Sequence, residues 1–433
     1  MEQLSIPDTI AKVVQEEFDK WPKKRHPLIR SETSKEWVPL SGIVVQRAED
    51  FTCVAAATGM KCLPKNKIVQ AQGVTLHDWH AEILALRSLN RFLLDECLVL
   101  LAATSCQEDD GKNCTISKYL RRRTREEITE SDFQPFSLRD DILLHMYCSE
   151  APCGDASMEL TMAAQRDSTP WEISAQSLTK KDVQSPPILL HGRSYFSQSG
   201  SIRGKPSRPD APPALSKSCS DKLALKQSTS LLSSITSLLI SPKNVYLNSL
   251  VVPISQFSKT ACDRAFSASG RLNTLQQRIQ VEKSWLGGYN FQPFIVYPTS
   301  LEFKYSRRQS LKPNESLSAS NNASFWTPYS SGTIIGGTCQ GRRQFSHEGA
   351  PPMCKRHIWK LALSIARLVG NMSLVNLLSS RDSTGAPRTY AEIKRSGLMI
   401  QRQKVKSIVR TVLGAEKGED GWVRNLGGDD WSL

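Results

Sequence analysis

Apolar and polar positions along the first part of the chain follow patterns that predict both helices and strands. Asp8–Lys20 repeats its apolar side chains at helical spacing, which predicts a short amphipathic helix. Gly42–Ala48 and Thr52–Thr58 are β-rich runs and predict a hairpin. Trp79–Leu94 is apolar nearly all round, so we expect a helix inside the protein, with Asp78 as its N-cap.

Similar patterns continue toward the C-terminus. Asp141–Cys148 and Val245–Val252 predict strands, with a tight turn at Ala151–Asp155 and a helix from about Ala156 between them. Strands that alternate with helices in this way predict an α/β sandwich. The other predicted elements are a helix at about Ser220–Ile240, short strands at Phe294–Tyr297 and Phe303–Tyr305, and helices at Met353–Val369 and Tyr390–Leu413.

Three segments interrupt these patterns. Residues 107–140 are charged and poor in aromatic residues, and we interpret them as an insertion or mobile loop. Gln165–Leu215 is rich in Ser, Pro and Gly and predicts mostly loop. Residues 309–324 form a polar, low-complexity loop. We found no internal repeat, and we predict a single domain over residues 1–433.

Composition and charge narrow the class of protein. The chain is 39% hydrophobic and 23% charged, as expected of a folded protein. It carries 56 Lys and Arg against 42 Asp and Glu, a formal charge of +14. Such a surplus favours a polyanionic partner, most often nucleic acid, although many proteins are simply basic.

Neither a secretory signal nor a membrane span is expected. The first residues lack a basic region followed by an apolar core, and no apolar run reaches about 18 residues. We therefore expect an intracellular protein of the nucleus or cytoplasm, with no membrane contact and no obligate protein partner. Its eleven cysteines should be thiols or metal ligands rather than a disulfide framework.

Three short motifs carry candidate chemistry: His80-Ala81-Glu82, Pro152-Cys153-Gly154-Asp155 and Ser218-Cys219-Ser220-Asp221-Lys222. Alone, each has an ordinary structural explanation, as polar surface or as a turn. Each nevertheless lies at the start of a predicted helix beside the predicted sheet, where such ends meet around one pocket. A cysteine at a helix N-terminus also has a lowered pKa, which favours the thiolate that binds metal.

One imidazole and two thiolates form a three-ligand zinc site whose fourth position is free for water, as in catalytic centres. Zinc lowers the pKa of that water, and a carboxylate that is not a ligand can carry its proton. His80, Cys153 and Cys219 are therefore the candidate zinc ligands, and Glu82 is the candidate proton donor and acceptor. The same set of groups is found in zinc deaminases that act on nucleobases.

In this order, the motifs HAE, PCGD and SCSDK resemble those of the adenosine deaminases that act on RNA. Cytidine deaminases and tRNA wobble deaminases instead place their cysteines in a Cys-x-x-Cys motif, and this chain has none. The early His80 leaves no room for tandem double-stranded-RNA-binding domains. Together with the segment from Arg203 to Asp210, this makes the chain most similar to the tRNA-specific members of the family.

The resemblance implies a cytidine-deaminase-like α/β/α sandwich with extra C-terminal helices. It also implies an inositol hexakisphosphate buried in the domain and Lys61 near the substrate nucleotide. Leu225 and Ile400 stand where the family has arginine and tyrosine, and Lys226 and Lys406 are candidate replacements. Residues implied to contact the inositol phosphate are Arg87, Lys222, Arg342, Tyr390, Lys394, Lys404, Trp422 and Asp430.

The implied activity is hydrolytic conversion of adenosine to inosine in the anticodon loop of tRNA. The implied target is the adenosine 3′-adjacent to the anticodon, position 37, of alanine tRNA. Three alternatives stay open at this point: a deaminase of the same type that acts on other structured RNA, a non-catalytic RNA-binding protein, and a cytosine deaminase, because the ligands alone do not choose the base.

Overall fold

An eight-stranded mixed sheet organises the chain. The computed structural model describes residues 4–31, 34–106, 117–164, 190–191, 199–205, 211–281, 285–307, 316–382, 384–414, 422 and 427–433. The helices are α1 (Ile6–Asp19), α2 (Ala81–Cys106), α3 (Met158–Ala163), α5 (Cys219–Thr229), α6 (Lys259–Phe266), α7 (Asn273–Val281), α8 (Lys355–Val369), α9 (Met372–Leu378), α10 (Tyr390–Arg395) and α11 (Ile400–Gly414).

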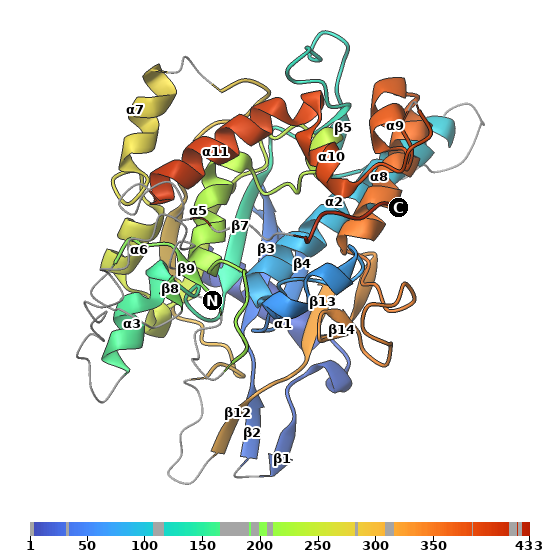
Figure 1. The fold of residues 1–433 in the computed structure, drawn as a ribbon. Coiled ribbons are helices and arrows are strands. Elements are labelled where there is room, and N and C mark those ends of the chain that lie inside the picture. The colour runs from blue at the N-terminus through green and yellow to red at the C-terminus, as the bar shows by residue number, and fades with distance from the viewer. Residues whose placement is uncertain are drawn as a thin grey trace, which may run out of the picture.

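The strand order in the large sheet is β11 (Ile295–Thr299), β10 (Leu247–Pro253), β7 (Leu143–Cys148), β3 (Leu40–Arg47), β4 (Asp50–Thr58), β13 (Ala323–Thr327), β14 (Ser330–Ile335) and β15 (Thr338–Cys339). Strands β7, β10 and β11 are parallel to one another, and the remaining neighbours are antiparallel. Helices cover both faces of this sheet (Figure 1). The predicted α/β class is therefore confirmed.

Each face of the sheet has its own apolar core. Helix α1 packs Val14 and Phe18 against one face, where Val44 and Tyr147 are buried with them. Gly42 of β3 makes this contact close, because a Cβ there would meet Val14 Cγ1 at 2.5 Å. Helix α2 covers the opposite face, within the larger core that α8 also joins. The predicted burial of α2 is confirmed, and the helix continues to Cys106, well beyond the predicted end at Leu94.

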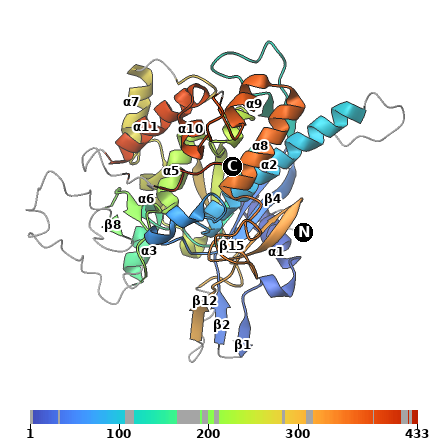
Figure 2. The same ribbon diagram turned by 45° about the vertical axis from the view of Figure 1, so that its right-hand side comes forward.

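The predicted β3–β4 hairpin and the strands at β7, β10 and β11 are confirmed. The tight link between β3 and β4 includes Ala48, which has a φ of 51°. A smaller sheet of β1 (Ile29–Ser31), β2 (Ser34–Trp37) and β12 (Ser316–Ala319) projects from the body of the molecule (Figures 1 and 2).

Several predicted boundaries are wrong, for local reasons. The helix predicted to reach Ile240 ends at Thr229, because Ser230 adopts a left-handed φ of 57°. The helix predicted at Tyr390–Leu413 is broken into α10 and α11 by an extended Ser396. Phe303–Tyr305 forms a turn rather than a strand. The sequence prediction also omitted α6, α7, α9 and β13–β15.

Parts of the three irregular segments contain regular structure. Within residues 107–140, β5 (Leu120–Arg122) pairs with β6 (Phe136–Leu138), and Leu120 and Phe136 reach the large core. Two arginines of the basic run there are engaged within the protein: Arg121 with Glu127, and Arg123 with Asp132. Residues 107–116 lie outside the described residues, as do 165–189, 192–198, 206–210 and 308–315.

Two further observations concern the cysteines and the helices. The nine cysteines whose side chains the structure describes are all free of disulfide bonds. In the described part of the chain, no helix combines the length and the hydropathy that a membrane crossing requires.

Candidate metal centre

His80, Cys153 and Cys219 meet in one place, although 73 and 66 residues separate them along the chain. Their ligand atoms all lie within 4.8 Å of one another, and Cys153 Sγ is 3.8 Å from His80 Nδ1. The structure therefore brings together the three residues that the sequence motifs singled out.

The N-terminus of α2 fixes the imidazole. The Leu84 N–H donates the first bond of the helix to the His80 carbonyl, and the Ala81 N–H donates to Gly59 after β4. The sequence analysis predicted Asp78 as the N-cap of this helix. That prediction is wrong by position, because α2 begins at Ala81. The Asp78 carboxylate instead accepts a hydrogen bond from the His80 N–H at 3.0 Å, which fixes the backbone just before the helix.

The two cysteine loops are held against each other. Gly154, with a φ of 102°, turns the chain after Cys153, and a Cβ there would collide with Ser218. Ser218 caps α5, so Cys219 is the first residue of that helix. Ser220 joins the loops directly: its hydroxyl lies 2.9 Å from the Pro152 carbonyl and 3.0 Å from the Cys153 carbonyl, and accepts a bond from the Ala156 N–H.

The donor set and its spacing fit zinc. With the usual bond lengths, sulfur and nitrogen at two corners of a zinc tetrahedron lie about 3.6 Å apart. The distance of 3.8 Å between Cys153 Sγ and His80 Nδ1 is close to this value. Among the described residues the group holds three donors, which is the number that catalytic rather than structural zinc sites take from the protein.

The two thiols differ in acidity. A hydrogen bond with Cys219, together with the charges of Lys205 and His80, holds the pKa of Cys153 well below its usual range against the effect of burial. Burial and the neighbouring Cys153 raise the pKa of Cys219. The Cys219 N–H points at Cys153 Sγ at 3.3 Å, as expected for a thiolate near a helix N-terminus.

Glu82 lies in the first turn of α2 and is buried. Burial raises the pKa of its carboxyl group, and the charge of Cys153 raises it further. A carboxyl group that readily holds a proton therefore stands beside the three ligands, as the proton-transfer role requires.

A buried chain of charges leads from Cys219 into the protein. Lys205 Nζ lies 3.2 Å from Cys219 Sγ and 2.8 Å from Asp78 Oδ2. The same carboxylate oxygen pairs with Lys222, and Ser216 donates to it at 2.8 Å. Burial alone would raise the pKa of Asp78, but the two ammonium groups hold it well below its usual range. The motif around Cys219 had included Lys222, and the segment from Arg203 to Asp210 had included Lys205, but neither predicted this connection.

Beyond Lys222 lies a group that we name the buried cation cluster. Its members come from five helices, Arg402 is buried and the other six are partly buried, and the carboxylates that pair with them in the described chain are Asp78 and Asp429. Burial and the neighbouring cations hold the pKa of Lys226 and of Lys406 well below the usual lysine range. The cluster comprises Arg87, Lys222, Lys226, Lys355, Lys394, Arg402 and Lys406.

Buried polar atoms without hydrogen-bond partners lie in and beside this cluster. They are Arg87 Nε, Arg402 Nε and His77 Nε2. Burial and the charges of Lys355 and Arg87 lower the pKa of His77, so this imidazole also lies in a positive environment. Buried cations and buried donors are normally paired, so the cluster has the properties of a polyanion site.

The predicted inositol phosphate contacts divide into two groups. Tyr390 borders the cluster, since its ring lies under Lys355 and Lys394 at 5.4 and 5.8 Å, and Trp422 stacks on Arg410. Arg342, Lys404 and Asp430 are exposed, and their contact with an inositol phosphate stays a prediction. The sequence prediction did not include Lys355, which pairs with Asp429, and Asp429 also pairs with Lys394.

The two departures from the family pattern have simple structural explanations. Leu225 belongs to an apolar cluster with α7 and α11, so its side chain has an apolar environment. Ile400 is exposed, and Arg402 and Lys406 of the same helix are the residues that reach the cluster. Lys226 and Lys406, the candidate replacements, both lie in it.

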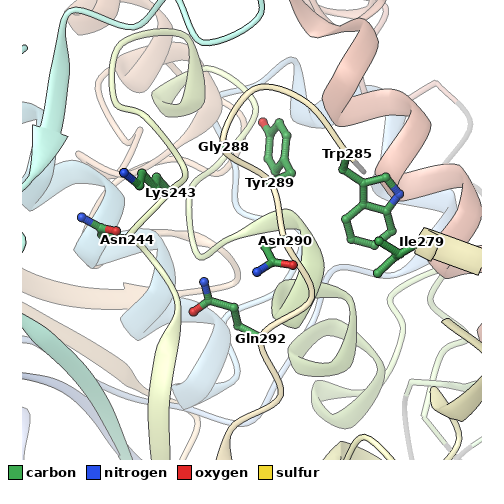
Figure 3. A pocket seen from close by; sticks show the side chains of 8 residues that line it. All are labelled: Lys243, Asn244, Ile279, Trp285, Gly288, Tyr289, Asn290 and Gln292. Atoms are coloured by element: carbon green, nitrogen blue, oxygen red, sulfur yellow. The ribbon is translucent and has the colours of Figure 1, made fainter. Parts of the chain in front are cut away.

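Lys61 is exposed and bonds the side chain of Asn321 in the loop between β12 and β13. Its role near the substrate stays a prediction. A separate hollow of about 440 Å³ contains none of the predicted site residues (Figure 3). It is lined by Lys243, Asn244, Ile279, Trp285, Gly288, Tyr289, Asn290 and Gln292.

Comparisons with known proteins agree with this chemistry. The family model described as the adenosine-deaminase (editase) domain matches residues 55–425. The chain is similar to tRNA-specific adenosine deaminase 1 of Schizosaccharomyces pombe, with 34% identity over 429 residues, which cover 98% of this chain and 96% of that protein. The protein of the same name from Saccharomyces cerevisiae is 32% identical over 243 residues, 55% of this chain and 56% of that protein. The double-stranded RNA-specific editase B2 of Mus musculus is 29% identical over 147 residues, 33% of this chain and 16% of that protein.

Proposed function

This chain belongs to the adenosine-deaminase (editase) domain family, and we propose that it is a zinc-dependent deaminase that converts adenosine to inosine in tRNA. The observation that carries the proposal is the convergence of His80, Cys153 and Cys219 beside the buried carboxyl group of Glu82. The names of the relatives that match more than half of the chain support tRNA as the substrate.

In the proposed reaction His80, Cys153 and Cys219 hold the zinc. When bound, the metal lowers the pKa of water toward neutrality. Glu82 accepts the proton that this water loses and gives it to the amino group that leaves C6 of adenine. Adenosine and water thereby become inosine and ammonia. The raised pKa of Glu82 suits a group that must hold a proton between these two steps.

We further propose that the target is the adenosine at position 37, 3′-adjacent to the anticodon of alanine tRNA. A buried site requires the base to leave its stack, at a cost of a few kcal/mol that is lower in a loop than in a duplex. This favours the anticodon loop over a stem. The exposed Lys61 then becomes a candidate contact for the substrate nucleotide.

The proposal extends to the interior and to the fold type. The buried cation cluster supports inositol hexakisphosphate as a resident ligand, because a polyanion would pair its cations and its orphaned donors. Acid extraction of purified protein followed by phosphate analysis tests this, and phosphate-free protein would exclude it. Helices on both faces of the sheet support a cytidine-deaminase-like sandwich, to which α8–α11 add the C-terminal helices.

Inosine mapping tests the activity. Purified protein is incubated with total tRNA, with an alanine tRNA transcript and with a perfect RNA duplex. Glu82→Ala serves as the catalytic variant and Glu348→Ala, which alters an exposed glutamate, as its matched control. We expect inosine at position 37 with the parent chain and the control only.

Each alternative gives a different result in this assay. Inosine in the duplex but not in tRNA would indicate a double-stranded-RNA editase. Uridine in place of cytidine would indicate a cytosine deaminase. Zinc-loaded protein that binds tRNA but makes no inosine would be the non-catalytic alternative. Equal activity in Glu82→Ala would refute the assigned role of that carboxylate.

A further inference from the structure

Two buried carboxylates follow the two cysteines at the same spacing. Asp155 stands two residues after Cys153, and Asp221 stands two residues after Cys219. Both side chains are fully buried. Neither belongs to the group of candidate metal ligands, so the proposed chemistry does not use them directly. Fully buried carboxylates need partners, and each of these two receives an arginine from one short segment of the chain.

Arg264 and Arg271 supply these partners. Arg264 Nε lies 3.0 Å from Asp155 Oδ1, and its Nη2 donates to the Asp155 carbonyl at 2.9 Å. Arg271 Nη1 lies 2.6 Å from Asp221 Oδ1, and its side chain is 4% exposed. One arginine therefore holds each cysteine loop, through the residue two positions after the cysteine.

The two arginines are fixed relative to each other by the backbone. The Arg271 N–H donates to the Arg264 carbonyl at 2.9 Å, so the end of α6 and the turn after it form a closed unit. Gly270 makes this return possible, because a Cβ at that position would collide with the Arg264 carbonyl. Both arginine side chains therefore extend from one short, closed piece of chain.

We propose that Arg264 and Arg271 form a clamp that sets the separation of Cys153 and Cys219. Both are positioning residues, because they contact the carboxylates and not the ligand atoms. The inference rests on the proposed metal centre and adds the groups that hold its geometry. Ser220 joins the two loops directly, and the clamp holds the two carboxylates that follow the cysteines.

The donors around Asp221 show what the arginine adds. Asp221 Oδ2 already accepts bonds from the Ser218 hydroxyl at 2.6 Å and the Arg203 N–H at 2.9 Å, both within its own region of the chain. Oδ1 receives the distant Arg271, so this bond ties the start of α5 to the turn after α6. Without it, the loop keeps its local bonds and its direct bonds through Ser220, but loses the connection that runs through Arg271 and Arg264 to the Asp155 loop.

Metal affinity tests the clamp. Metal-free protein is titrated with Co²⁺, whose absorption reports thiolate ligation and tetrahedral geometry, and the Zn²⁺ dissociation constant is measured by competition with a chelator. The variants are Arg264→Met, Arg271→Met and Arg271→Lys. Arg278→Met, which alters an exposed arginine of α7, is the matched control. The unfolding temperature of each metal-free variant is recorded alongside.

We expect Arg264→Met and Arg271→Met to raise the Zn²⁺ dissociation constant about 10-fold or more and to weaken the tetrahedral Co²⁺ bands. Arg271→Lys should recover part of the affinity, and Arg278→Met should match the parent chain. If Arg271→Met does not fold, Arg264→Met and Arg271→Lys decide by the same criteria.

Two results would overturn the inference in distinguishable ways. Lower unfolding temperatures with unchanged metal affinity and unchanged Co²⁺ bands would show that the arginines only stabilise the fold. A parent chain that gives no thiolate-to-cobalt absorption would remove the metal centre itself, and with it the proposed function.

Discussion

Replacing Lys205 by Met is the most informative single change in the network that lies behind the metal centre. The lysine side chain is 3% exposed and pairs at 2.8 Å with Asp78, which is 2% exposed. Removing one partner of such a pair leaves a buried charge with less compensation, which costs about 3–5 kcal/mol. Lys222 still faces Asp78, so we expect the lower end of this range.

The matched control is Lys304→Met. Lys304 pairs with Asp19 at 2.7 Å, nearly the same distance, but the two side chains are 54% and 53% exposed. Solvent screening and side-chain entropy limit such a pair to about 0–1 kcal/mol. The two variants thus differ mainly in the burial of the pair that they break.

Denaturant unfolding of the metal-free proteins measures both costs, which keeps metal affinity out of the comparison. In a cycle with Asp78→Asn, the double variant should lose less stability than the sum of the two single variants. Equal costs for Lys205→Met and Lys304→Met would refute the argument, because burial would then not determine the value of the pair.

Three further outcomes follow from the structure. Gly154→Ala should cost more stability than Gly341→Ala, because both positions have a positive φ but only Gly154 is also crowded; equal losses in thermal unfolding would contradict this. Gly42→Ala should cost about 1–3 kcal/mol by overpacking, and Val14→Ala in the same chain should restore part of it; chemical denaturation would show no restoration if the contact were unimportant. The lowered lysine pKa values in the buried cation cluster mean that the ligand-free chain binds more protons when unfolded than when folded. Its free energy of unfolding should therefore rise with pH, toward about pH 10, more steeply than that of Lys406→Met. Parallel curves for the two proteins would count against the cluster.

The spacing of apolar residues correctly predicted the elements whose own sequence carries a clear apolar pattern. Helix α2 is apolar on nearly every side, and α8 begins at Lys355, two residues after the predicted start at Met353. Element ends were harder to predict. The pattern of Leu and Ile after Thr229 remains helical, yet Ser230 turns left-handed and the apolar residues fill the core from irregular backbone. Where such a helix ends depends on packing against residues that are distant in the sequence.

The sequence by itself determined the metal ligands and the proton carrier as candidates, because the chemistry of zinc requires specific residue types in recognisable motifs. Only the tertiary structure decided which charges stand behind them. Lys205, Lys355 and Arg402 are ordinary basic residues in the sequence, and Arg342 and Lys404 looked equally suitable. The two groups differ in exposure: Arg342 and Lys404 are exposed, whereas the other three are shielded from solvent. A cation needs a partner only when the fold shields it from water, and that shielding depends on packing between helices that are far apart in sequence.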